Sequence, residues 1–360
     1  MKDRLSLHER LLLEINRASL KLRTLDHELH QLFWECTLRC NLSCLHCGSD
    51  CRVSSSIQDP PLSDLTMVLD EIAQRYDPSK ILVITTGGEP LMRDDIVECG
   101  RAITERGFKW GMVSNGLCLN ERKMTSLHEA GLKTIAISLD GFEEHHNWMR
   151  GNNNSYQRAV NAIRILSQTR DITWDVITCA NKRNLSQLSD FGKYLLDLGV
   201  SRWRIFTIFP YGRAMAEADL HLSGDELLQL MDFIKKTRED DVMRVEYSCE
   251  GFLGPMEGKV RNRLYSCSAG INIASVLADG SISGCLSIRH NYHQGNIHRD
   301  SFCDVWENKF KNYRDRSWMK KDECAACKMW RYCQGNGMHL RDENGDLALC
   351  HYNKMFRPGV

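Results

Sequence analysis

The chain has 360 residues, with 47 Lys plus Arg and 47 Asp plus Glu, so its formal net charge is zero. A chain without excess positive charge has no overall field that attracts nucleic acid or an anionic membrane, and we expect neither as a partner. Hydrophobic residues make up 42% and charged residues 26%, which is typical of a soluble globular protein. No apolar run approaches the roughly 18 residues that would predict a membrane span.

Sixteen cysteines are the unusual feature of the composition. The N-terminus reads Met-Lys-Asp-Arg and leads into a charged helical pattern, whereas a secretory signal peptide has an apolar segment there. We therefore expect a cytoplasmic chain whose thiols are reduced. Clustered thiols in a reducing compartment indicate metal ligands rather than disulfides.

The first predicted element is a helix over residues 4–22, where leucines recur at roughly helical spacing among charged residues. We expect it to pack against the main domain, with docking of a partner as the alternative. From residue 31 onwards, β-branched runs alternate with amphipathic segments. Strands are predicted at 31–36, 80–86, 108–113, 134–139, 172–179 and 202–208, and helices at 63–75, 94–105, 120–130, 155–168, 184–198 and 223–236. The expected N-caps include Ser63, Asn120 and Asn184.

This alternation predicts an α/β fold with a parallel sheet of six βα units. The periodicity fits either an open doubly wound sheet or a partial barrel. Near residue 245 the alternation gives way to short strands, glycine turns and cysteines, which indicates a second domain. The expected organisation is an N-terminal helix at 1–30, a βα domain at 31–245 and a cysteine-rich domain at 246–360.

Three cysteines follow the first predicted strand, and Cys40, Cys44 and Cys47 have the spacing C-x3-C-x2-C. Three thiolates hold three irons of a four-iron cluster and leave the fourth iron open, whereas structural zinc takes four closed ligands. A zinc site would need a fourth ligand from Cys36, Cys51 or His46, which are all close in sequence.

The three-cysteine loop resembles the signature of the radical S-adenosylmethionine (SAM) superfamily, with His46 in the position before the third cysteine. This resemblance implies a partial (β/α)6 barrel and a [4Fe-4S] cluster on Cys40, Cys44 and Cys47 with exchangeable SAM at the open iron. The chain is also similar to a radical SAM family of the Bacteroidetes that is linked to a lipoprotein system.

Polar sets follow three further predicted strands, where parallel α/β folds bind their ligands. Gly87-Gly88-Glu89-Pro90 resembles the superfamily motif that holds the SAM amino group. Two glycines let backbone carbonyls approach an ammonium closely, and the carboxylate adds negative charge. Each set alone is a common turn, but together and in this order they predict a SAM site. The resemblance implies cofactor binding by Gly87, Gly88, Glu89, Ser114, Asn115, Ser138, Asp140 and Arg150.

The second domain resembles the SPASM extension, an iron-sulfur domain of radical SAM enzymes that typifies peptide and protein modification. The implied metal ligands are Cys267, Cys285, Cys324, Cys327, Cys333 and Cys350. The last four complete the ligation of one auxiliary [4Fe-4S] cluster, although a zinc knuckle would use the same spacing. The family's seventh cysteine is replaced by Gly337, so we expect one or two auxiliary clusters, with Cys249 and His339 as possible substitute ligands.

The resemblance implies an enzyme that reductively cleaves SAM and uses the 5′-deoxyadenosyl radical to modify a peptide or protein. An electron donor such as flavodoxin or ferredoxin is the other implied partner. One alternative is an enzyme of small-molecule cofactor biosynthesis of the tetrapyrrole type, and another is a non-catalytic metal-binding regulator. No catalytic acid or base is assigned, and Arg213, in a Pro-x-Gly-Arg-Ala turn, fits a substrate-facing loop and a structural turn equally.

Overall fold

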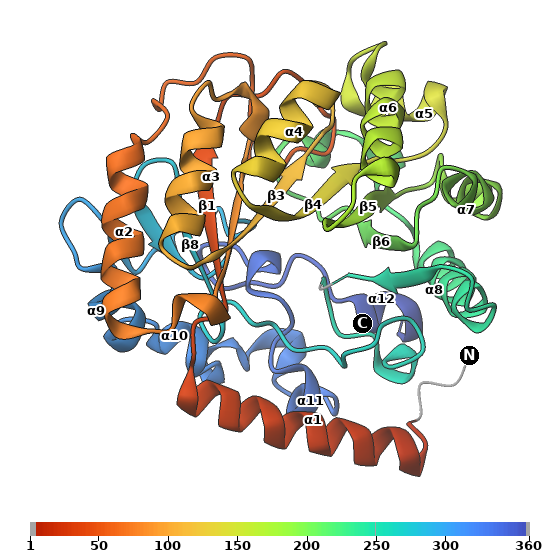
Figure 1. Cartoon of the computed structure of the whole chain (residues 1–360). Helices are drawn as coiled ribbons and strands as arrows, with labels where there is room; N and C mark the ends of the chain where they lie inside the picture. The colour runs from red at the N-terminus through yellow and green to blue at the C-terminus, as the bar shows by residue number, and fades with distance from the viewer. Residues whose placement is uncertain (1–4, 249, 358–360) are drawn as a thin grey trace.

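The computed structural model describes residues 5–248 and 250–357, and it contains one ten-stranded sheet with the strand order β10-β9-β8-β1-β2-β3-β4-β5-β6-β7 (Figure 1). Strands β1 to β7 run parallel to one another. Their bounds are β1 Gln31–Thr37, β2 Leu82–Gly87, β3 Lys109–Ser114, β4 Leu132–Ser138, β5 Thr173–Ala180, β6 Arg202–Thr207 and β7 Arg244–Tyr247. This is the partial barrel that the resemblance implies.

Helices cover the outer face of this sheet, as Figure 1 shows. They are α2 Leu62–Arg75, α3 Ile96–Glu105, α4 Glu121–Glu129, α5 Glu143–Arg150, α6 Ser155–Gln168, α7 Leu188–Asp197 and α8 Gly224–Glu239. Trp34, Trp110 and Trp203 lie at this interface and are at most 1% exposed. Gly100 of α3 lets the helix approach Trp110, because a Cβ at this position would lie 2.1 Å from the indole ring.

The inner face of the sheet is packed much less completely than the outer face. Side chains alternate between the two faces of a strand, so Phe33, Ile84, Ile177 and Phe206 point into the barrel while their strand neighbours point outwards. All four inward side chains are half-buried, whereas their outward neighbours Trp34, Val83, Val176 and Ile205 are at most 1% exposed. The interior therefore carries apolar groups that remain partly exposed, with Asp175 and Arg204 on the same face.

The C-terminal region continues the same sheet across the predicted boundary at residue 245. Strand β8, Ile273–Val276, runs parallel to β1, and β9 (Ser281–Ser283) and β10 (Gly295–Asn296) follow in antiparallel pairing. The remaining helices are short: α9 Phe302–Asn308, α10 Lys311–Arg314, α11 Trp330–Cys333 and α12 His351–Phe356. The pairing of β8 with β1 joins the end of the chain to the strand that precedes the Cys40 loop.

The first helix, α1, spans Leu7–Asp26 and begins with a capping box between Ser6 and Glu9. It lies along α11 and the C-terminal region, below the barrel in the view of Figure 1, and buries Leu13 and Leu20. The helix packs against the protein, as predicted, but in the described part of the chain its contacts are with the C-terminal region and not with the main βα domain. Among the residues that the structure describes, no helix is both long and apolar enough to cross a membrane.

The predicted strands and long helices are present within a few residues of their expected bounds, and one of the three predicted N-caps is found. Asn120 caps α4 as predicted, because its side chain accepts a hydrogen bond from the Lys123 backbone at 2.9 Å. Ser63 lies inside α2, whose N-cap is Pro61, so that prediction is wrong. Asn184 forms no side-chain cap, and its side-chain nitrogen instead donates to the Asp140 carbonyl oxygen at 2.7 Å.

Candidate active site

The three-cysteine loop follows β1, and backbone contacts join its two ends. Arg39 and Arg52 form a parallel bridge, and the Cys40 backbone N–H donates to the Arg52 carbonyl at 2.7 Å. Cys40 and Cys44 are buried and Cys47 is half-buried. The loop therefore presents three thiols from a backbone that is fixed at both ends.

Burial and hydrogen bonding give these thiols different acidities. Burial raises the pKa of Cys40 to about 12. The neighbouring Cys51 thiol donates a hydrogen bond to Cys47, which lowers the pKa of Cys47 to about 5. Cys51 thus enters the site as a partner of Cys47, whereas its position in the sequence indicated only the fourth ligand of a zinc site.

The Gly87-Gly88-Glu89 turn packs directly against the chain that enters the loop. Gly88 N–H donates to Thr37 O at 2.7 Å, and Glu89 N–H donates to Arg39 O at 2.9 Å. A Cβ at Gly87 would lie 2.2 Å from Thr37 O, and one at Gly88 would lie 2.1 Å from Arg39 O. Both glycines are therefore required by the close approach of these two backbones.

Glu89 joins its own turn to Ser114 and Asn115, which lie at the end of β3. Its carboxylate accepts hydrogen bonds from the Ser114 hydroxyl at 2.8 Å and the Asn115 backbone N–H at 2.7 Å. Burial raises the pKa of Glu89 in spite of these bonds. The Asn115 amide donates to Asn41 Oδ1 at 2.8 Å and lies 3.9 Å from Cys40 Sγ, so this set reaches the cysteine loop.

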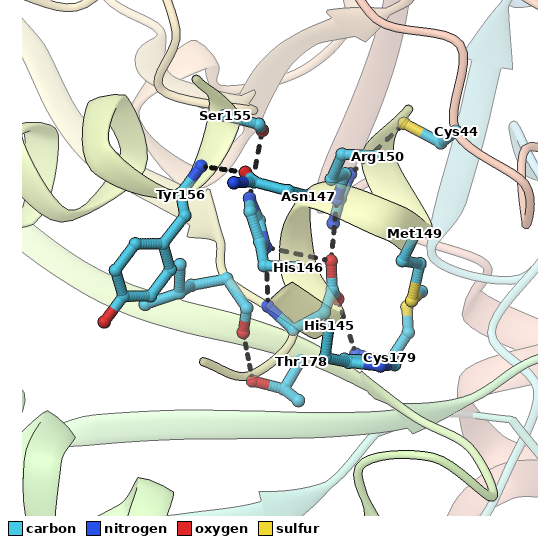
Figure 2. A network of polar contacts seen from close by, with 12 residues as sticks. Cys44, His145, His146, Asn147, Met149, Arg150, Ser155, Tyr156, Thr178 and Cys179 are labelled. Carbon is cyan, nitrogen blue, oxygen red and sulfur yellow. Dashed lines mark hydrogen bonds and ion pairs between the residues drawn. The ribbon is translucent and has the colours of Figure 1, made fainter. Parts of the chain in front are cut away.

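Asp140, which follows β4, and Arg150 of α5 form a buried ion pair beside a cysteine sulfur, and Figure 2 shows the contact of Arg150 with Cys44. Arg150 Nε lies 2.6 Å from Asp140 Oδ2, and Arg150 Nη1 lies 3.7 Å from Cys44 Sγ. Although burial opposes ionisation, Arg150 holds the pKa of Asp140 well below its usual range. A guanidinium donor beside Cys44 stabilises that sulfur as a thiolate, the form that binds iron.

His146 orients Asp140 without carrying a charge. Its Nδ1 accepts a hydrogen bond from the Asp140 backbone N–H at 3.0 Å, so Nε2 carries the ring proton and donates to Ser155 Oγ at 3.0 Å. The contact of 3.5 Å between Nδ1 and the Asp140 carboxylate is therefore not an ion pair. Burial lowers the pKa of His146, which agrees with a neutral ring.

Two arginines from distant segments hold the loop from outside. Arg213 Nε donates to Cys44 O at 2.8 Å, and its Nη1 lies 2.6 Å from Asp50 Oδ1. Arg289, from the C-terminal region, contacts Ser49 Oγ and lies 2.7 Å from Glu35. The Arg213 turn is structural in this arrangement, and Arg289 is a site residue that no sequence motif indicated.

A second group that sequence reasoning missed lies at the ends of β6 and β7. The Glu250 carboxylate accepts hydrogen bonds from the Thr207 backbone N–H at 2.8 Å and the Tyr247 hydroxyl at 3.1 Å. Glu250 is buried, and burial raises its pKa to about 7. This carboxyl group can therefore hold a proton near neutral pH at the ligand-binding end of the barrel.

Four of the predicted auxiliary ligands are together. A single small cavity is lined by Cys324, Cys327, Cys333 and Cys350. Two donors point at these sulfurs: Arg341 Nη2 lies 3.4 Å from Cys324 Sγ, and the Asn353 N–H lies 3.5 Å from Cys350 Sγ. Four thiols with nearby N–H donors match the needs of a negatively charged cluster.

The other two predicted ligands, Cys267 and Cys285, do not lie in a set of four thiols within the described residues. Although burial disfavours the thiolate, the Arg316 guanidinium lowers the pKa of Cys267. Cys267 and Cys285 both lie near the Tyr313 hydroxyl. Burial raises the pKa of this hydroxyl, and the two thiols raise it further. At Gly337 an added Cβ would lie 2.6 Å from the His339 ring, so this ring fills the space of a side chain there. The candidate ligand Cys249 lies outside the described residues.

Within residues 5–248 and 250–357, no three His, Cys, Asp or Glu side chains converge as ligands of a single metal ion. Cluster ligation differs, because each thiolate binds its own iron. Of the predicted SAM-binding residues, Gly87, Gly88, Glu89, Ser114 and Asn115 form one group with the Cys40 side of the loop, and Asp140 and Arg150 form another with Cys44. Ser138 ends β4 and is half-buried.

Comparison with known proteins decides what this arrangement is. Residues 34–195 match the radical SAM superfamily, and residues 267–328 match the SPASM iron-sulfur cluster-binding domain. The chain belongs to the radical SAM superfamily. It is a radical SAM enzyme with a C-terminal SPASM domain. Its cofactors are a [4Fe-4S] cluster with SAM in the barrel and auxiliary iron-sulfur clusters in the SPASM domain.

Several characterised relatives match most of this chain. An AdoMet-dependent heme synthase of Methanosarcina barkeri is 25% identical over 91% of this chain and 96% of its own. The mycofactocin maturase MftC of Mycobacterium tuberculosis is 27% identical over 85% of this chain and 78% of its own.

Solved structures share the fold. anSMEcpe with bound AdoMet and Cp18Cys peptide gives a TM-score of 0.68 at 20% identity, over 90% of this chain and 93% of that one. Streptococcus suis SuiB bound to precursor peptide SuiA gives a TM-score of 0.68 at 16% identity, over 88% and 74%.

Proposed function

We propose that this enzyme modifies a tetrapyrrole, with the radical generated at the Cys40, Cys44 and Cys47 loop. Heme synthase and Fe-coproporphyrin III synthase relatives support this substrate, because they match the chain over most of its length. This proposal replaces the peptide or protein substrate that the sequence resemblance favoured and keeps the tetrapyrrole alternative.

The barrel interior carries the proposal. A tetrapyrrole has a large flat apolar ring, and Phe33, Ile84, Ile177 and Phe206 line the inner face of the sheet and remain partly exposed. Binding such a ring would bury the part of these side chains that is still exposed, which stabilises by about 25 cal/mol per Å² of apolar surface removed from water. The contrast with the fully packed outer face supports an interior kept free for an apolar substrate.

The chain's own polar groups have separate roles in this proposal. The cluster and SAM, when bound, supply a 5′-deoxyadenosyl radical that abstracts a hydrogen atom from the substrate. Arg150 stabilises the Cys44 thiolate, and Cys51 donates to the Cys47 sulfur. Glu89, Ser114 and Asn115 face the opposite side of the loop and would hold the polar groups of SAM. Glu250 would exchange a proton at the barrel end.

A peptide substrate is the second candidate, because MftC matches 85% of the chain and is named as a maturase of mycofactocin. The two candidates differ in what the interior must accept. A tetrapyrrole needs apolar side chains against the faces of its ring, whereas an extended peptide also needs backbone hydrogen-bonding partners along its path.

The test is substrate-dependent SAM cleavage. Anaerobically reconstituted enzyme with a strong reductant should form 5′-deoxyadenosine faster when Fe-coproporphyrin III is added, and the tetrapyrrole mass should change. Phe206→Asp should abolish this stimulation while substrate-free cleavage continues. Val242→Asp, on the exposed surface, is the matched control and should behave as wild type. Stimulation by maturase precursor peptides, with none by the tetrapyrrole, would overturn the proposal in favour of peptide modification.

A further inference from the structure

Helix α1 carries an exposed apolar stripe that the fold does not use. Twelve large hydrophobic side chains are exposed in the described residues, and six of them lie on this one helix. Their exposed fractions run from 39% to 86%, in Leu7, Leu11, Leu12, Ile15, Leu22 and Leu25. The stripe from Leu7 to Leu25 extends along about 27 Å of helix at a rise of about 1.5 Å per residue. A contiguous patch of this length marks an interaction surface.

The spacing of the stripe identifies the kind of partner. Leu11, Ile15, Ala18, Leu22 and Leu25 are separated by four, three, four and three residues, and all five are exposed. This is the a/d pattern of a coiled coil, in which a second helix supplies matching side chains.

The opposite side of α1 confirms which face is free. Leu13 and Leu20 are seven residues apart, lie directly opposite the stripe and are buried against the protein. The protein body therefore holds the helix with the a/d face towards solvent. A partner would dock on a helix that is already formed, so association would not have to offset the cost of nucleating it.

We propose that α1 pairs with α1 of a second copy of this chain in a parallel, in-register coiled coil. In this register Lys21, at a g position, lies beside Asp26 of the other copy, at an e position. Both residues are exposed, and within the described residues neither has an ion pair. Twofold symmetry produces this contact twice, because Lys21 of each copy lies beside Asp26 of the other copy.

The charge of the helix favours a protein copy over a membrane surface. Helix α1 contains Arg10, Arg17, Lys21 and Arg23 against Glu9, Glu14 and Asp26, which is nearly balanced. Helices that lie on anionic membranes carry mainly Lys and Arg on the polar face.

Sedimentation of the anaerobically purified holoenzyme over a concentration series tests the pairing. Wild type should dimerise reversibly, and Ile15→Glu with Leu22→Glu should raise the dimer dissociation constant by at least about tenfold. Arg10→Glu adds the same charge to α1 outside the stripe and is the matched control. Circular dichroism of each variant checks that α1 remains folded.

A charge exchange tests the register. Lys21→Glu and Asp26→Lys should each weaken the dimer, and the double variant should restore it. A monomeric wild type would overturn the proposal, and its sedimentation with phosphatidylglycerol vesicles would assign the stripe to a membrane instead. A dimer that the Ile15→Glu, Leu22→Glu variant leaves intact would also overturn it.

Discussion

Single side chains set the charge at each sulfur atom of the cysteine loop. Cys44 faces the Arg150 guanidinium, Cys47 accepts from the Cys51 thiol, and Cys40 lies near the Asn115 amide. Hydrogen bonds to cluster sulfurs are one of the means by which proteins adjust the reduction potential of an iron-sulfur cluster. The loop therefore supplies three ligands with three different electrostatic surroundings.

Replacing Cys40, Cys44 and Cys47 together by Ala should abolish 5′-deoxyadenosine formation, because no thiolate then holds the SAM-binding cluster. Auxiliary iron should remain bound to the variant. Cys303→Ala removes a buried thiol outside every predicted ligand set, and this control should retain activity. 5′-Deoxyadenosine formed by the triple variant, measured by chromatography, would contradict the assignment.

Glu250 makes stability depend on pH. Folding raises its pKa from 4.5 to about 7 through burial, so the folded chain keeps a proton that the unfolded chain releases between these values. The contribution is complete below about pH 4.5, decreases as the pH rises and is lost above about pH 7. Glu250→Gln should remove this decrease and raise the free energy of unfolding at pH 8 by about 2 to 3 kcal/mol. Urea titrations at pH 5 and pH 8 measure the difference, and identical slopes against pH in both proteins would refute it.

Among the structural elements, the turn at Gly337 shows how a missing ligand is accommodated. The backbone of Gly337 has a φ of −71°, which any residue adopts, so the glycine is required by space alone. The imidazole of His339 occupies that space and lies 5.1 Å from the Phe209 ring, centre to centre. This turn thereby connects the SPASM domain to the loop after β6.

Gly337→Ala should destabilise the protein by about 1 to 3 kcal/mol, because the added methyl group collides with the His339 ring. His339→Ala in the same chain removes the collision and should recover most of the loss. Urea unfolding under anaerobic conditions measures both variants. If the double variant is as unstable as Gly337→Ala, the nearby Glu250 carbonyl, and not His339, sets the limit.

Sequence periodicity predicts the regular elements well but leaves out contacts that depend on tertiary structure. The six strands of the βα units have strong β-branched patterns, so they appear within about two residues of expectation. Helix α5 was missed because its sequence, Glu-Glu-His-His-Asn-Trp-Met-Arg, is mostly polar, and three of its four buried residues are His145, His146 and Arg150. The motifs predicted the cysteines and strand-end residues. The roles of Arg289 and Glu250 follow from contacts between distant segments that no local pattern records.

At the scale of the whole molecule, the barrel and the SPASM domain form one continuous sheet. Strand β8 of the SPASM region pairs with β1, and the N–H of Ala278, just after the end of β8, donates to Glu35 at 3.0 Å. Glu35 also binds Arg289, so the strand that leads into the cysteine loop is fixed by residues more than 240 positions away. The two regions therefore share their core instead of meeting at a loose interface.

Iron content should report the number of clusters in the intact enzyme. Cys333→Ala should lower bound iron by about four atoms per chain, because it removes one of four thiolates around a complete auxiliary site. Wild type should contain about twelve iron atoms if Cys267 and Cys285 hold a further cluster and about eight if they do not. Elemental analysis of reconstituted protein distinguishes these cases, with Cys267→Ala as the comparison. Unchanged iron in Cys333→Ala would contradict the auxiliary site.

The hydrogen bond from Arg289 to Ser49, called the clasp below, can form only late in synthesis of the chain. Ser49 and Arg289 are 240 positions apart, so a ribosome that has released the cysteine loop must still synthesise most of the chain before the clasp forms. At typical synthesis rates of about 5 to 20 residues per second, this interval lasts about 12 to 50 seconds. During this time the nascent loop lacks its outer cover and is open to iron carriers and to oxidants. Anaerobic growth would protect these thiols over the same interval, before the C-terminal region closes over them.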